Sequence, residues 1–286
     1  MINQGLDPIG KEKTQLGSTA WGKAGWLVKA GKSLGNGYAG LFYVFLYAPI
    51  VLLVLFSFNS SRFPNHWESF TLDWYIKLFD NYAVAQALKN TLIVSFSSMV
   101  ISTIIGTMVS VAIERYRFKI KPAVDGMLFL PIIIPDIAMA IMLLAFFVLV
   151  KIPLGLPTII IAHVAFNISF VAVIVRARMA SLGPTLEEAA GDLYANEWKT
   201  FWRVTFPLLV PGILAGALFA FTLSLDDYVI TFFTSGPGST TLPVRIYSMV
   251  KRGITPEINA VSSLLLLASM LLVPLSQWLQ RRSNMT

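Results

Sequence analysis

The chain has 286 residues, 56% of them hydrophobic and 13% charged, and its mean hydropathy is +0.69. Because a soluble domain carries about 25% charged residues, this composition excludes a purely water-soluble enzyme. The absence of cysteine excludes disulfides and thiolate metal sites. With only His66 and His163, a zinc or di-iron centre would need carboxylates that the chain barely supplies. The net charge of +7 gathers on one side of the predicted membrane, so it indicates no nucleic-acid partner.

Six apolar stretches are long enough to cross a bilayer, which takes about 20 residues per helix. They cover residues 38–58, 90–113, 123–150, 157–175, 207–225 and 258–279. The pattern predicts an all-α integral membrane protein with a transmembrane domain over 38–280, a polar N-terminal leader over 1–37 and a short tail over 281–286. These spans leave no room for a separate ATPase domain.

The orientation of the spans follows from the distribution of Lys and Arg, which gather on the cytoplasmic side of membrane proteins. With the N-terminus in the cytoplasm, cytoplasmic segments hold 15 of the 22 Lys and Arg residues. The turn over 114–122 (ERYRFKIKP) gives the strongest single indication. We therefore predict a multi-pass protein with both termini in the cytoplasm.

The outer connections differ in length and character. Residues 59–89 are polar and aromatic, which fits either an interfacial aromatic belt or a docking surface. The short connection at 151–156 makes the third and fourth spans an antiparallel hairpin. Residues 226–257 are punctuated by Gly and Pro; irregular backbone at this depth is tolerated only where it is buried in protein or lines an aqueous path.

The cytoplasmic connection over 176–206 has the pattern of two short amphipathic helices joined by a tight bend. Thr185 and Glu188 have the spacing of a capping box, and Asn196 is placed to cap the second helix. In that second helix an aromatic side is predicted by the helical spacing of Trp198, Phe201 and Trp202. A loop of this length with caps and an amphipathic pattern is usually functional.

This segment resembles the EAA loop in the permease subunits of binding-protein-dependent ABC importers. The family pattern is Glu-Ala-Ala, three residues, Gly, nine residues, an aliphatic residue, any residue, then Leu-Pro; here Glu188-Ala189-Ala190 is followed at the matching spacing by Val204 and Pro207. The resemblance implies six transmembrane helices with a MetI-like type I ABC permease core and a cytoplasmic coupling helix. It places the protein in a bacterial inner membrane.

Two positions depart from the family pattern: Tyr194 stands where the family has Gly, and Phe206 where it has Leu. Glycine permits a left-handed turn between the two helices. Because tyrosine adopts that turn only at a cost, we expect the bend to be built differently, with Asn196 taking the positive φ.

The resemblance also implies how the loop works. In the family its first helix docks in a groove of a cytoplasmic ATPase, present in two copies, which binds ATP and magnesium; this chain then has no cofactor and is not itself an enzyme. The residues assigned to this coupling are Glu187, Glu188, Ala189, Ala190, Tyr194 and Pro207.

Three further stretches resemble spermidine/putrescine permeases, in particular the second of their two permease subunits. They are FNSSRF over 58–63, LPIIIPDIAMAIMLL over 130–144 and the run over 223–260, which contains SLDD, SGPG and PEIN. The resemblance covers about 38–280 and implies a second permease subunit and an extracytoplasmic polyamine-binding protein as partners, besides the lipid bilayer.

A polyamine is a flexible polycation with apolar spacers, so its path should offer carboxylates and aromatic faces. The candidates are Asp136, Asp226, Asp227, Tyr228 and Phe232. For the three aspartates a second interpretation stays open. Asp136 follows two prolines and would cap a broken helix, and Asp226 and Asp227 would serve the end of the fifth span through local ion pairing.

Four other residues carry structural expectations. His163 and Asn167 share one face of the fourth span, which favours hydrogen bonds between helices. Gly212 and Gly216 form a small-residue packing motif in the fifth span. Arg176 and Arg178 are predicted to anchor the fourth span at the inner headgroups.

Two other functions remain open on the sequence alone. One is an ABC permease for a different small ligand, which labelled-ligand uptake would distinguish. The other is a stand-alone secondary transporter, which predicts paired inverted repeats; no convincing repeat of fixed period is seen, and the docking loop occurs once.

Overall fold

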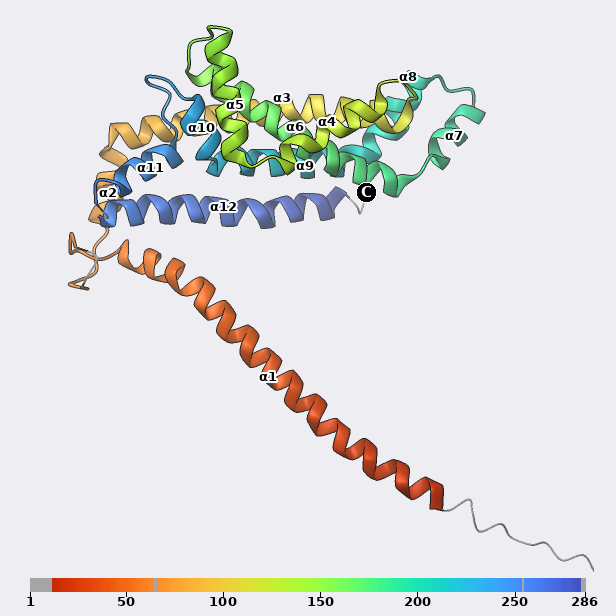
Figure 1. Cartoon of the computed structure of the whole chain (residues 1–286), viewed down its shortest axis with the longest axis horizontal. Coiled ribbons are helices and arrows are strands. Elements are labelled where there is room, and N and C mark those ends of the chain that lie inside the picture. The colour runs from red at the N-terminus through yellow and green to blue at the C-terminus, as the bar shows by residue number, and fades with distance from the viewer. Residues whose placement is uncertain (1–11, 64–65, 254, 284–286) are drawn as a thin grey trace, which may run out of the picture. The chain divides into compact units, whose positions relative to one another are not determined.

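The computed structural model describes residues 12–63, 66–253 and 255–283 (Figure 1). In these ranges the regular secondary structure is helical, apart from one isolated antiparallel bridge between Asn59 and Phe70. Its internal contacts divide it into two units, Met1–Leu55 and Phe56–Thr286.

The first unit contains most of α1 (Glu12–Phe56), a single helix of 45 residues. Its segment Gly35–Phe56 is long and apolar enough to cross a membrane, which fits the first predicted span. The predicted boundary between leader and span at residue 37 lies inside this helix. Residues 1–11 of the predicted leader lie outside the described part of the chain.

The second unit begins with an irregular segment and continues through short and long helices. In chain order they are α2 (Asp73–Asp80), α3 (Tyr82–Arg115), α4 (Lys121–Ile133), α5 (Asp136–Leu149), α6 (Leu156–Leu182), α7 (Thr185–Asp192), α8 (Glu197–Thr200), the π-helical turn η2 (Phe201–Thr205), α9 (Phe206–Asp226), α10 (Val229–Thr234), α11 (Leu242–Val250) and α12 (Pro256–Ser283).

The predicted spans correspond to these helices. Besides α1, three continuous helices pass the length and hydropathy requirement for a span: α3, α6 and the joined helix Glu197–Asp226, which runs through α8, η2 and α9. The third predicted span is a bent pair, α4 and α5, with an angle of 113° between them. The sixth corresponds to α12, apolar over Pro256–Leu271. The tail beyond Ser283 is outside the described residues.

Proline explains the break between α4 and α5. Pro135 has no backbone N–H and disfavours the helical conformation of the preceding residue, and Ile134 is accordingly extended, with ψ of 133°. Asp136 becomes the first residue of α5 and its side chain makes no capping hydrogen bond. The broken helix is therefore confirmed, whereas the capping role that the sequence allowed for Asp136 is wrong.

Small residues let α3, α6 and α9 approach closely. A Cβ atom placed on Gly106 of α3 would lie 2.8 Å from the Val171 side chain of α6, and one on Gly216 of α9 would lie 3.3 Å from the same side chain. A Cβ on Gly212 would lie 2.7 Å from the Cβ of Arg178. The predicted packing role of Gly212 and Gly216 is confirmed, and α6 is the partner helix.

Hydrogen bonds between side chains join the same three helices. The Asn167 amide of α6 donates to the Ser224 hydroxyl of α9 at 2.8 Å, and this hydroxyl is 2.8 Å from that of Ser98 on α3. All three residues are buried. The interhelical role predicted for Asn167 is confirmed, and such bonds contribute about 0.6 kcal/mol each in membrane proteins.

The two arginines of α6 are engaged within the protein. Arg176 pairs with Glu114 of α3, at 2.8 Å, and with Asp125 of α4. Arg178 donates to the Leu208 carbonyl of α9 at 3.1 Å. The predicted role of these residues as headgroup anchors stays a prediction, and the structure adds that the charge of Arg176 is neutralised by two carboxylates that the sequence places far away.

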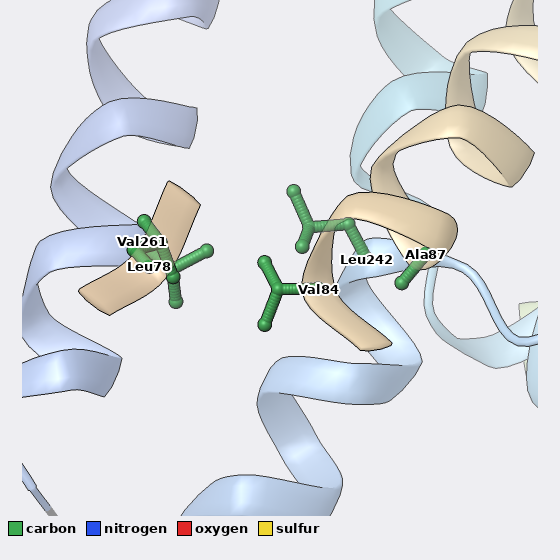
Figure 2. Packing of buried hydrophobic residues seen from close by; sticks show 5 residues of the cluster. All are labelled: Leu78, Val84, Ala87, Leu242 and Val261. Carbon is green, nitrogen blue, oxygen red and sulfur yellow. The ribbon is translucent and has the colours of Figure 1, made fainter. Parts of the chain in front are cut away.

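At the end of the second unit that carries α2 and α11, an apolar cluster joins four helices. Figure 2 shows Leu78 of α2, Val84 and Ala87 of α3, Leu242 of α11 and Val261 of α12. Asn81 caps α3 through its side-chain oxygen and donates to Glu257 of α12 at 2.8 Å. In Figure 1 this end, with α2 and α11, lies away from the end that carries α7 and α8.

The segment between α1 and α2 is organised around Asn59, which is fully buried. Its amide donates to the His66 carbonyl at 2.7 Å and its side-chain oxygen accepts from the Glu68 backbone N–H at 3.0 Å. The Trp74 indole donates to the Asn59 carbonyl at 2.8 Å. This tryptophan, part of the predicted aromatic segment, therefore holds the loop together.

Candidate functional site

The predicted coupling segment forms one end of the second unit (Figure 1). α7 covers Thr185–Asp192, as the sequence pattern requires, but its N-cap is Pro184 and no side chain caps it. The predicted capping box of Thr185 and Glu188 is wrong, because Thr185 is already the first helical residue and its hydroxyl is not placed to accept from the free backbone N–H groups.

The bend after α7 is built on Tyr194 itself. Its φ is +58°, whereas that of Asn196 is −75°, so the expectation that Asn196 would take the positive φ is wrong. The Tyr194 N–H donates to the Gly191 carbonyl at 2.9 Å and the Ala195 N–H to the Ala190 carbonyl at 3.0 Å. This pair of bonds is the Schellman termination of a helix, and it holds tyrosine in the conformation that the family gives to glycine.

The tyrosine side chain makes no contribution to this bend, since it is 99% exposed. Changing Tyr194 to Gly should therefore remove a left-handed strain of about 1 kcal/mol and stabilise the loop. Hydrogen exchange of the amides of 185–205 measures this as slower exchange. The control is Leu193→Gly, also exposed but with an ordinary φ of −86°, where exchange should become faster. Slower exchange in both variants would contradict the assignment of strain to Tyr194.

The second predicted helix is not a separate element. Asn196 caps it by accepting from the Lys199 N–H at 2.9 Å, as predicted, but the helix continues through η2 into α9. Pro207 directly follows η2 inside this continuous helix, where it cannot donate a hydrogen bond to the preceding turn. The predicted aromatic side is present, with ring centroids of Trp198 and Trp202 5.7 Å apart.

The acidic residues of α7 point in different directions. Glu187 is the inner one: it pairs with Arg115 at 2.7 Å and accepts from the Thr205 hydroxyl at 2.7 Å. Glu188 and Ala189 are exposed and Ala190 is half-buried. The outward face of α7 thus has a carboxylate beside small side chains, which permits close approach of another protein.

A second polar contact joins the end of α3 to the start of α8. The Tyr116 hydroxyl donates to the Glu197 carboxylate at 3.2 Å. This hydrogen bond, and then the negative charge of the carboxylate, raise the pKa of Tyr116 because both favour the protonated phenol. A cavity of 290 Å³ between the end of α3 and the coupling helices is lined by Tyr116, Glu187 and Glu197, among others.

At the other end of the second unit, the Asp227 carboxylate is engaged by neighbouring groups of the protein. Its carboxylate accepts from the Thr231 N–H at 2.8 Å and the Thr231 hydroxyl at 2.9 Å, and it lies 3.2 Å from Nε2 of His163. Asp227 also accepts from the Ile230 N–H at 3.3 Å. Of the two interpretations from sequence, the geometry of Asp227 favours the helix-end role. His163 makes the predicted bond between helices.

Asp226 is free of such partners. It is exposed, and no Lys or Arg of the described residues pairs with it. It lines a cavity of 510 Å³ together with Tyr228 and Tyr247, whose rings are 4.5 Å apart, and with apolar and hydroxyl side chains of α11 and α12. A carboxylate beside two aromatic faces suits an organic cation.

The other predicted path residues lie outside the lining of this cavity. Phe232 is 48% exposed, and its ring centroid lies 5.5 Å from that of Tyr228 in a tilted contact, whereas Asp136 is exposed at the break between α4 and α5. The sequence reasoning missed Tyr247, although Pro243, Tyr247 and Val250 have the helical spacing of one lining face. It also missed Arg115 and Thr205 as partners of Glu187. Within the described residues no cluster of His, Asp and Glu is placed to hold a metal ion.

Comparison with known proteins agrees with this arrangement. Residues 100–284 match the model of the family described as "Binding-protein-dependent transport system inner membrane component". The chain belongs to this family and is a multi-pass protein of the inner membrane. The predicted ABC permease fold is confirmed by the crystal structure of a bacterial ABC transporter for alginate, with a TM-score of 0.71, 20% identity, and coverage of 91% of this chain and 96% of that one.

Two curated relatives are more similar in sequence. The spermidine/putrescine transport system permease protein PotC of Escherichia coli K12 is 42% identical over 251 residues, which is 88% of this chain and 95% of the relative. The putrescine transport system permease protein PotI of the same organism is 39% identical over 231 residues, 78% of this chain and 82% of the relative.

Proposed function

We propose that this chain is a permease subunit of an ATP-driven ABC importer and forms half of the translocation path for polyamines such as spermidine and putrescine. One observation carries the proposal: a single continuous helix, Glu197–Asp226, begins at the coupling bend and ends at the cavity of Asp226. Its 30 residues extend over about 45 Å at 1.5 Å per residue, so the coupling bend and the cavity lie at the two ends of one helix.

The chemistry of the cavity supports a polyamine as the ligand. The Asp226 carboxylate attracts one ammonium group, and the faces of Tyr228 and Tyr247 attract a cation by about 0.5–2 kcal/mol. The apolar side chains of α11 and α12 that complete the lining suit the methylene spacers. The names of the similar permeases, which refer to spermidine and putrescine, support the same substrate class.

The remaining subunits of the importer are separate chains. A soluble ATPase, in two copies, binds ATP and magnesium. It contacts the exposed face of α7, which carries Glu188 and Ala189. A second permease subunit completes the path, and an extracytoplasmic binding protein delivers the polyamine. Because only binding that differs between two states can drive a cycle, the cavity alternates between the two sides of the bilayer as the ATPase opens and closes.

This proposal fixes an orientation. The end of the second unit with α7 and α8 faces the cytoplasm, together with both termini, and the end with α2 and α11 faces outward. The ion pairs of Arg176 with Glu114 and Asp125 then lie near the cytoplasmic boundary.

The proposed coupling predicts the effect of changing the outward face of α7. Glu188→Lys combined with Ala190→Trp should reverse a charge and add bulk where the ATPase docks, and so uncouple ATP hydrolysis from polyamine uptake. Glu188 is exposed, Ala190 is half-buried and no residue of α7 is fully buried, so the amount of protein in the membrane should be unchanged. Uptake of labelled spermidine and ATP hydrolysis are measured on the same complex. Unimpaired transport by the double variant would refute the docking role.

A further inference from the structure

α7 is positioned by polar groups, since it has no packed apolar face. None of its residues is buried, and the cavity of 290 Å³ lies between it and the end of α3. A helix that buries no apolar side chain gains little from packing. Its position therefore depends on the few hydrogen bonds and ion pairs that reach it.

Glu187 is the centre of these bonds. One carboxylate oxygen lies 2.7 Å from Nε of Arg115, and the other accepts from the Thr205 hydroxyl at 2.7 Å. The Glu187 and Arg115 side chains are only 21% and 24% exposed, so the pair is screened less than a surface salt bridge. Arg115 also donates to the Gly183 carbonyl at 3.5 Å, which brings the end of α6 to the same point.

The partners of Glu187 end two membrane helices. Arg115 is the last residue of α3, and Thr205 is the last residue of η2, directly before α9. η2 is a π-helical turn, and such turns are frequent at functional sites. One carboxylate therefore joins the coupling helix to α3 and to the helix that ends at Asp226.

We propose that Glu187 is the positioning residue that transmits the displacement of α7 to α3 and α9, with Arg115 and Thr205 as its two partners. We call these three residues the clasp. The inference rests on the proposed coupling to an ATPase and deepens it. Glu188 contacts the ATPase, whereas Glu187 acts inside the permease. The two adjacent acidic residues of the EAA loop therefore have different roles.

The test uses the complete importer in proteoliposomes, with its ATPase, second permease and spermidine-loaded binding protein. The measured quantity is the number of spermidine molecules imported per ATP hydrolysed. Glu187→Gln and Arg115→Gln should each lower this ratio at least fivefold, while the ATPase still copurifies with the permease. The double variant should be no worse than the more severe single variant, because residues in one network are not additive. The exchanged pair, Arg115→Glu with Glu187→Arg, should recover part of the ratio.

Asp192→Asn is the matched control, since it removes the same charge from the same helix at a residue that is exposed; its ratio should equal that of the unchanged complex. Thr205→Val gives an independent test, because it removes one hydrogen bond and keeps the shape of the side chain, and it should lower the ratio about two- to threefold.

The clasp is overturned if Glu187→Gln leaves the number of spermidine molecules imported per ATP within twofold of the unchanged complex, or if the effects of the single variants simply add. Loss of the ATPase from the Glu187→Gln complex would also overturn it, because Glu187 would then lie in the docking interface. Failure of the proposed function is distinguishable, because then the unchanged complex itself shows no ATP-dependent import of spermidine.

Discussion

Changing Gly236 to Ala should destabilise the protein by about 1–3 kcal/mol, the range typical of overpacking, and reduce the amount of folded protein in the membrane several-fold. A Cβ on Gly236 would overlap the Leu154 carbonyl, lying 2.5 Å from its carbon and 3.1 Å from the Gly155 nitrogen. These are backbone atoms of the turn between α5 and α6, which cannot move aside as a flexible side chain can. The SGPG segment is therefore seated against this turn.

The measurement is the thermal unfolding of the detergent-purified protein, together with its amount in the membrane. Gly155→Ala is the matched control, because it lies in the same contact and a Cβ there would meet only Pro157, at an ordinary 3.7 Å. The control should unfold within a few degrees of the unchanged protein. An unchanged unfolding temperature for Gly236→Ala would mean that the loop is not seated as described.

Adjacent aspartates at the end of α9 should respond in opposite ways. Asp226→Asn keeps size and shape at an exposed position, so stability should be unchanged, while spermidine uptake falls about tenfold, as the loss of roughly 1.4 kcal/mol of carboxylate–ammonium attraction implies. Asp227→Ala removes the acceptor for the Ile230 and Thr231 N–H groups and the neighbour of His163. It should destabilise the protein by about 2 kcal/mol, with uptake lowered in proportion to protein amount.

Uptake per molecule of permease in the membrane separates these effects, and thermal unfolding measures the second directly. Ser235→Ala is a suitable control, since it removes a hydroxyl whose hydrogen bond to the Phe232 carbonyl is long and weak, at 3.4 Å. Equal loss of uptake per molecule in both aspartate variants would contradict the division of roles. So would normal uptake in Asp226→Asn.

The spans could be predicted from sequence because they depend on local composition. A helix that crosses the bilayer satisfies its own backbone, so a run of apolar residues is sufficient evidence, and the break at Pro135 follows from the chemistry of proline. The position of the coupling helix α7 was also predicted from local spacing, whereas its capping and the residue that takes the positive φ were not. The same reasoning gave the cap at Asn196 and the bond between helices at Asn167.

Ion pairs and hydrogen bonds between distant segments could not be predicted from the sequence. The ion pairs of Arg176 were missed because its partners, Glu114 and Asp125, belong to other helices. The partners of Glu187 were missed for the same reason. Tyr194 is a different case: its propensity argues against a left-handed turn, and the two hydrogen bonds that close the helix override it.

As proposed, the permease is inert alone and is driven by a separate ATPase. The most direct test compares proteoliposomes that contain the isolated chain with proteoliposomes that contain the complete importer, each supplied with ATP, binding protein and labelled spermidine. We expect ATP-dependent accumulation only with the complete importer. Accumulation of spermidine or hydrolysis of ATP by the isolated chain would contradict the account.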